Sequence, residues 1–194
     1  MDNILEKINS ILKNDGVIAF VTDTVWGLGC LPNSEKAVKK IYEIKERDAK
    51  KPLILMSYDT YPMFEYLNQP IEKEAQKLIK HYFPGALTLV LPKSETCPEY
   101  LTSGLLTVGI RVPDNKIFSD ICKNIEGGVL ATTSANHSGE PPALTYEEAI
   151  KYVGDKVDLV VEDFGEKAQG RASTVAGFKD GKVVIFRQGE VYID

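Results

Sequence analysis

Small hydrogen-bonding side chains gather in two loops, and each loop follows an apolar run of strand length. Thr22-Asp23-Thr24 comes directly after residues 17–21, and the segment 132–138 ends a run that begins at Val129. Proteins built from alternating strands and helices usually bind ligands at the ends of strands. Threonine and aspartate also cap turns without binding anything. For the loop 22–24, ligand binding and turn capping both remain possible interpretations. In the segment 132–138, five of the seven residues are small hydrogen-bonding groups, and this favours a ligand site.

A basic segment interrupts an acidic chain. The protein has 194 residues and a net charge of −5, yet residues 36–51 contain seven basic and three acidic side chains. This segment therefore carries +4, and the other 178 residues carry −9. Lys45, Arg47, Lys50 and Lys51 crowd at the end of a predicted helix, where cations offset the helix dipole. The pattern fits either a solvated helix face or a local anion site.

Arg111 lies inside the apolar run 107–113, where an unpaired charge is costly to bury. Its guanidinium is suited to hold a carboxylate or phosphate through two parallel hydrogen bonds. A structural ion pair with one of the protein's own acids is the alternative. Ser173 and Arg187 lie in the last predicted strands and fit either a ligand site or a sheet edge.

Several classes of protein are excluded. The sequence contains no GxxxxGK[ST], no GxGxxG after a strand and no GxSxG, and it has two histidines. Three cysteines without CxxC spacing argue against a zinc site or a disulfide framework and favour a reducing cytoplasm. No segment approaches the roughly 20 apolar residues of a membrane helix, and the N-terminus does not resemble a secretory signal.

The elements that must position these residues alternate along the chain. Apolar spacing predicts helices at 2–13, from Ser34 to the basic segment, and at 60–67, 71–82, 117–122 and 145–152. Apolar runs predict strands at 17–21, 53–56, 87–91, 107–112, 129–132, 159–161, 173–176 and 182–186. Gly16 is expected to form a left-handed helix cap, 22–29 a loop, and Thr145 with Glu148 a capping box. The order predicts a single α/β domain over residues 1–194, with a mixed sheet flanked by helices.

Seven short blocks, in the expected order, resemble the threonylcarbamoyl-AMP synthases, the YrdC-like (TsaC) family, in its short single-domain form. The resemblance covers the chain from Gly16 to Gly189. The blocks are Thr22–Gly29, Lys45-Glu-Arg47 with Lys51-Pro-Leu53, Phe83-Pro-Gly85 with Thr88, Val108–Pro113, Thr133–Gly139, Ser173-Thr-Val175 and Arg187-Gln-Gly189. The resemblance implies a twisted α/β sheet with a basic concave cleft. It also implies a nucleotidyltransferase that converts L-threonine, bicarbonate and ATP into threonylcarbamoyl-adenylate and pyrophosphate.

The resemblance assigns roles to residues. Thr24, Arg111, Thr132 and Ser173 would contact threonine. Lys45, Arg47 and Lys51 would hold the triphosphate and act in catalysis. The other nucleotide contacts would be Thr107, Ser134, Asn136, Ser138, Pro142 and Arg187. Magnesium would be held mainly by the phosphates. The product would feed threonylcarbamoyl-adenosine formation, with tRNA and downstream transfer proteins as partners.

The chain departs from the family pattern at three positions. Val21 replaces the usual proline, Trp26 replaces tyrosine or phenylalanine, and Met56 stands where some members have histidine. These changes concern the shape of the substrate pocket. Two alternatives remain: an RNA-binding module of the same fold without catalysis, and carbamoyl-adenylate chemistry on another acceptor. The net charge of −5 argues against the RNA-binding module.

Overall fold

A mixed sheet of nine strands organises the part of the protein that the structure describes. The computed structural model describes residues 2–46, 51–137 and 139–193. The strand order across the sheet is β7-β1-β2-β6-β3-β5-β4-β8-β9. The strands are β1 (Ile18–Phe20), β2 (Gly27–Cys30), β3 (Ile54–Ser57), β4 (Leu87–Pro92), β5 (Thr107–Arg111), β6 (Val129–Ser134), β7 (Leu159–Val160), β8 (Thr174–Lys179) and β9 (Lys182–Arg187). The pairs β1–β7, β3–β5 and β4–β8 are parallel, and the others are antiparallel.

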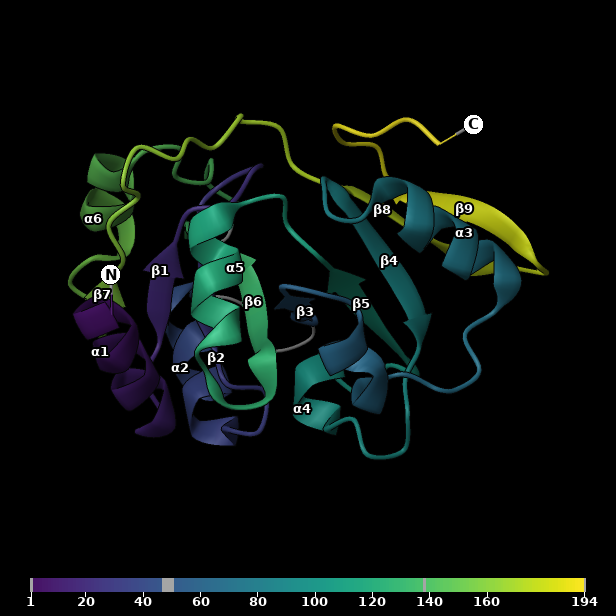
Figure 1. Cartoon of the computed structure of the whole chain (residues 1–194), viewed down its shortest axis with the longest axis horizontal. Helices are drawn as coiled ribbons and strands as arrows, with labels where there is room; N and C mark the ends of the chain where they lie inside the picture. The colour runs from purple at the N-terminus through teal and green to yellow at the C-terminus, as the bar shows by residue number, and fades with distance from the viewer. Residues whose placement is uncertain (1, 47–50, 138, 194) are drawn as a thin grey trace.

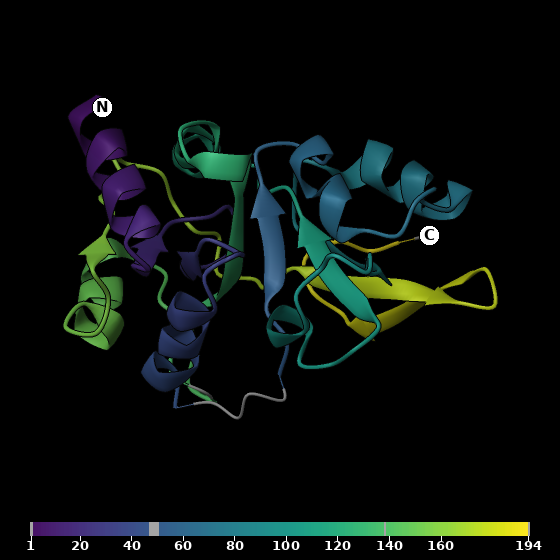
Figure 2. The ribbon, with the colours of Figure 1, turned by 90° about the horizontal axis from the view of Figure 1, so that it is seen from below.

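Helices cover both faces of this sheet. They are α1 (Asp2–Lys13), α2 (Glu35–Ile44), α3 (Lys73–Tyr82), α4 (Glu99–Thr102), α5 (Lys116–Lys123) and α6 (Tyr146–Val153), with short 3-10 turns at Tyr61–Tyr66 and Glu126–Gly128. Helices α1, α5 and α3 lie on one face and α2 and α4 on the other (Figure 2). Helix α6 lies beside the edge strand β7 (Figure 1). The predicted fold, a single α/β domain with a mixed sheet, is confirmed.

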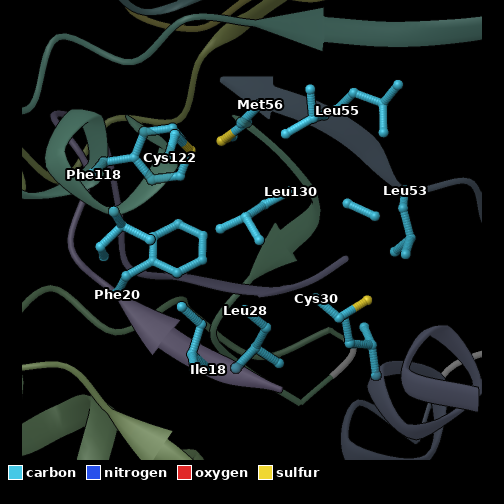
Figure 3. Close-up of a cluster of buried hydrophobic side chains, with 14 of the residues drawn as sticks. Ile18, Phe20, Leu28, Cys30, Leu53, Leu55, Met56, Phe118, Cys122 and Leu130 are labelled. Atoms are coloured by element: carbon cyan, nitrogen blue, oxygen red, sulfur yellow. The ribbon is translucent and has the colours of Figure 1, made fainter. Parts of the chain in front are cut away.

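The core packs around β1 and its neighbours. Phe20 lies beside Phe118 of α5, with ring centroids 5.1 Å apart, and Leu130 of β6 is next to it (Figure 3). Ile18, Ala19 and Phe20 are fully buried, as expected for a strand covered on both faces. The buried residues of α2 are Ala37, Val38, Ile41 and Ile44, as its spacing predicts.

The expected loop at 22–29 is wrong in its second half, because Gly27–Cys30 forms strand β2. Glycine normally weakens a strand, so the pattern gives little strand signal. A Cβ on Gly27 or Gly29 would lie 2.9 or 2.8 Å from the Phe20 ring. The two glycines therefore allow the Phe20 ring to pack directly against the backbone of β2.

Two expected helix caps also differ. Asp15, not Gly16, has the left-handed backbone after α1, with φ of 60°. Gly16 is needed for space, because a Cβ there would lie 2.3 Å from the Ile11 side chain. At α6, the Thr145 hydroxyl accepts the Glu148 N–H as predicted, but the Glu148 carboxylate binds the N–H of Leu144 instead of that of Thr145. Helix α4 had not been predicted from the sequence.

No helix among the described residues has both the length and the apolar character that a membrane crossing requires.

Candidate functional site

A cavity of about 440 Å³ brings most of the predicted site residues together. Successive residues of a strand point to opposite faces, so alternate residues share one side of the sheet. Ile54 and Met56 of β3 line the cavity, as do Thr132 and Ser134 of β6. The register pairs Ile54 with Thr132, and Met56 with Arg111 of β5. The sheet therefore forms one wall of the cavity.

The hydroxyls of Thr22 and Thr24, in the loop that follows β1, lie 3.1 Å apart and have different partners. Thr22 Oγ1 donates to the carbonyl of Val25 at 2.6 Å and accepts the N–H of Thr24 at 3.2 Å, so it caps the turn. Thr24 Oγ1 instead accepts a hydrogen bond from Arg111 Nη1 at 2.7 Å. The capping interpretation therefore fits Thr22, ligand binding by Thr24 stays a prediction, and both threonines line the cavity.

Arg111 is only 2% exposed and is held by three groups of the protein. Nη2 lies 2.5 Å from Asp23 Oδ1, Nη1 donates to Thr24, and Nε donates to the carbonyl of Gly85 at 2.9 Å. Burial lowers the pKa of Arg111, and the carboxylate of Asp23 opposes this shift. The structural ion pair that the sequence left as an alternative is therefore present. A guanidinium has five N–H groups, and three of those of Arg111 are bonded within the described ranges of the chain.

Asp23 has no assigned role in the sequence prediction, although it stands within the first polar loop. Its side chain is 10% exposed. Burial raises the pKa of Asp23, and the charge of Arg111 acts against that rise. Its backbone carbonyl accepts the N–H of Gln169 at 3.1 Å, which joins this loop to the segment that leads to Ser173. The sequence feature that points to such a residue is Arg111, because a buried arginine needs a counter-charge. The sequence does not show which acid supplies that charge.

Ser173 connects three strands at the same end of the cavity. Its hydroxyl lies 2.9 Å from Thr88 Oγ1 of β4, and it accepts Arg187 Nη2 of β9 at 3.2 Å. Arg187 also donates twice to the carbonyl of Ser173. Burial lowers the pKa of Arg187. Thr88, which was noted in the sequence without a role, also lines the cavity.

Lys45, directly after α2, is 2% exposed and fixes the loop that follows β6. Its Nζ donates to the carbonyls of Ser134 and Asn136 at 2.6 and 2.9 Å and to Asn136 Oδ1 at 2.6 Å. Three protein acceptors for the three N–H groups of an ammonium group leave few donors for a ligand. In this structure Lys45 therefore holds the loop and contributes positive charge to the cavity, and its direct contact with a triphosphate stays a prediction.

The loop after β6 is also tied to Trp26. The backbone N–H of Trp26 donates to the carbonyl of Ala143 at 2.9 Å. The backbone N–H of Ala135 donates to the carbonyl of Trp26 at 2.8 Å. Asn136 Nδ2 donates to the carbonyl of Glu140, and Ser134 Oγ donates to Asn136 Oδ1. These bonds place Ser134, Asn136 and Pro142 along one wall of the cavity.

Among the described site residues that the sequence predicts, Thr107 lies away from this cavity. Thr107 stands at the opposite end of β5 from Arg111, opposite Pro92, and lines a separate cavity of about 300 Å³. Because a strand rises about 3.3 Å per residue, four residues separate the two side chains by roughly 13 Å. Arg47 and Ser138 lie outside the described residues. Lys51 does line the cavity, as do Thr132 and Ser173.

The charge of the cavity lining is positive. Lys45, Lys51, Arg111 and Arg187 line it, and within the described part of the chain no acidic side chain does. Such a concentration of cations attracts an anion of several charges. The volume is in the usual range of small-molecule sites, about 300–1,000 Å³. The described ranges contain no cluster of three metal-ligating side chains.

Comparison with known proteins gives a consistent match. The family model described as "Telomere recombination" (Sua5, YciO and YrdC) matches residues 10–189. Threonylcarbamoyl-AMP synthase of Pyrococcus abyssi is 38% identical over 179 residues, 92% of this chain and 52% of that protein. The protein of the same name from Buchnera aphidicola is 36% identical over 91% of this chain and 99% of its own length. The structure of P. abyssi Sua5 complexed with L-threonine superposes with a TM-score of 0.89 at 33% identity, over 97% of this chain and 55% of that one. The chain thus spans about half of the P. abyssi protein and nearly all of the Buchnera protein.

Proposed function

This chain belongs to the Sua5/YciO/YrdC family, and on that premise we propose that it is a threonylcarbamoyl-AMP synthase. It converts L-threonine, bicarbonate and ATP into threonylcarbamoyl-adenylate and pyrophosphate, for threonylcarbamoyl-adenosine formation in tRNA. The relatives that carry this name and the solved threonine complex of a relative support the proposal. The observation that carries it is the cavity, where four cations and a row of hydroxyl groups meet at the ends of strands.

Threonine occupies the end formed by Thr24, Arg111, Thr132 and Ser173 in this proposal. The two remaining N–H groups of Arg111 bind the carboxylate, because charge-assisted bonds from a guanidinium are among the strongest in proteins. The hydroxyls of Thr24 and Ser173 are within the same network and can donate to a carboxylate or accept from an amine. Burial of this end excludes water from the reacting amine.

ATP occupies the rest of the cavity. Lys51, Arg187 and the charge of Lys45 balance the triphosphate, together with Arg47, which stays a proposal from the sequence. Ser134, Asn136, Ser138 and Pro142 form the nucleotide side. Thr107 is left out, because it lines the separate cavity. Magnesium enters with ATP, since phosphate oxygens are its usual ligands.

The chemistry proceeds without a covalent enzyme intermediate. The amine of threonine becomes a carbamate, either by adding carbon dioxide and losing a proton or by reacting with bicarbonate and releasing water. A carbamate oxygen then attacks the α-phosphorus of ATP, and the bond to pyrophosphate breaks. The protein contributes by holding the two reactants in line and by neutralising the phosphate charge.

The proposal is tested by pyrophosphate release with ATP, threonine and bicarbonate each omitted in turn. Pyrophosphate release should require all three substrates. ADP in place of ATP should give no pyrophosphate, because ADP has only one phosphate beyond the α-phosphate. Release that continues without threonine would indicate another acceptor and contradict the proposal. RNA binding with no turnover would identify a non-catalytic module instead.

A further inference from the structure

Asp23 stands behind the threonine end of the cavity and does not line it. The residues on either side of it, Thr22 and Thr24, both line the cavity. The carboxylate of Asp23 contacts Arg111 from the protein side at 2.5 Å, and its side chain is nearly buried. Asp23 can therefore influence a ligand through Arg111 without touching it.

The three bonds of Arg111 fix its orientation. They run to Asp23 and Thr24 in the loop after β1 and to Gly85 in the turn before β4. A planar guanidinium held at three of its N–H groups can rotate little, so its two other N–H groups point in fixed directions. Without the carboxylate, the strongest of these three restraints is lost.

Charge gives Asp23 a second effect. Arg187 is close enough to Arg111 for its charge to lower the pKa of Arg111. Arg187 also lines the cavity and donates to the hydroxyl of Ser173, so it borders the threonine end as well as the space left for the triphosphate. An Arg111 without its counter-charge would add a second guanidinium there and favour a phosphate group. The negative charge of Asp23 offsets that of Arg111, which leaves this end of the cavity less positive than two unpaired arginines would make it.

We propose that Asp23 is a positioning residue that orients Arg111 and offsets its charge, so that this end of the cavity accepts an amino-acid carboxylate in preference to a phosphate group. The inference rests on the proposed function, because threonine is the ligand whose carboxylate Arg111 would bind. Asp23 would then help to determine that threonine, and not a phosphate group of ATP, occupies the end of the cavity at Arg111.

The test is threonine binding to Asp23→Asn, measured by calorimetry beside ATP binding and thermal unfolding. We expect the threonine Kd to rise about tenfold or more, which is at least 1.4 kcal/mol, while the ATP Kd stays within about twofold. Inorganic phosphate, which should not compete with threonine in the wild type, should compete in the variant. Asp158→Asn is the matched control, because Asp158 also pairs with a cation, Lys40, but outside the cavity.

Unchanged threonine affinity in Asp23→Asn would overturn the inference. An equal loss of threonine and ATP affinity with a lower melting temperature would do the same and assign Asp23 to the scaffold. Absence of phosphate competition would overturn the charge effect. If Asp23→Asn does not fold, Asp23→Glu is decisive: it keeps the charge but displaces Arg111, so wild-type threonine affinity would contradict positioning. A wild type that binds no threonine would instead refute the proposed function.

Discussion

Lys45 and Arg111 are two cations that line the cavity and are almost completely buried, yet the protein holds them differently. Lys45 donates to carbonyl and amide oxygens of the loop after β6. Arg111 contacts a carboxylate, a hydroxyl and a carbonyl from two other segments. Each side chain therefore ties together parts of the chain far apart in sequence while placing a positive charge beside the cavity.

Removal of Lys45 should separate this loop from the end of α2. Lys45→Ala removes a charged donor from three acceptors, of which the Ser134 carbonyl keeps the N–H of Asn136 and Asn136 Oδ1 keeps the Ser134 hydroxyl. The free energy of unfolding should therefore fall by about 2–3 kcal/mol, the scale of a hydrogen bond to a charged group. ATP affinity should fall with it, because the nucleotide wall loses its support. Lys39→Ala, on the exposed face of the same helix and paired with Glu35 at 2.9 Å, should cost less than about 0.5 kcal/mol. Urea denaturation of both variants checks this, and equal losses would contradict the role of Lys45.

Replacement of Arg111 by lysine keeps the charge but not the planar fork. A single ammonium cannot reach Asp23, Thr24 and Gly85 from the position of the guanidinium. We therefore expect Arg111→Lys to lower the free energy of unfolding by about 2–4 kcal/mol and to weaken threonine binding. Arg171→Lys is the control, because Arg171 forms an exposed pair with Glu190. Normal stability with weakened threonine binding would mean that Arg111 serves the ligand alone.

At the scale of elements, Asp158 links helix α2 to the strand edge at β1. Its carboxylate accepts Lys40 Nζ at 2.6 Å and the N–H of Val17 at 2.7 Å, just before β7 pairs with β1. Partial burial acts to raise the pKa of Asp158, but the bonds from Lys40 and Val17 outweigh burial and leave it below its ordinary value of 3.8. The ionised carboxylate is therefore favoured by the folded state.

This lowered pKa predicts a pH-dependent contribution to stability. The contribution is complete above the ordinary pKa and disappears as the pH falls through the lower folded-state pKa, because the unfolded chain then binds more protons. Asp158→Asn should be less stable than the wild type near pH 7, and the difference should shrink toward about pH 3. Unfolding free energies of both proteins at the two pH values test this, with Asp155→Asn, an exposed aspartate, as control. A difference that does not change with pH would contradict it.

The elements that the sequence predicts well are those with a strong apolar period. Helix α1 has the expected bounds, and the buried face of α2 is the expected one. Strand β2 escaped prediction because its glycines serve the packing of Phe20, a contact between separate strands. The partner of Arg111 escaped for the same reason, because the ion pair with Asp23 is set by tertiary structure. Thr107 shows the converse, since a residue in the correct strand can still lie at its far end.

At the scale of the whole molecule, the protein carries a net charge of −5 but lines its cavity with cations. This separation favours a compact anionic ligand over an extended polyanion, whose binding requires basic side chains spread along a surface. The sheet makes the separation possible, because strands β6, β3, β5, β4, β8 and β9 each bring between one and three lining residues to the same cavity. The proposed function is therefore small-molecule chemistry in this cavity.

The most direct test of that chemistry is detection of the product itself. The protein is incubated with ATP, L-threonine and bicarbonate labelled with carbon-13, and the mixture is examined by mass spectrometry. The account predicts a threonylcarbamoyl-adenylate whose mass increases with the label, because the carbamoyl carbon comes from bicarbonate. Formation of this adenylate without the label, or consumption of ATP with no such adenylate, would contradict it.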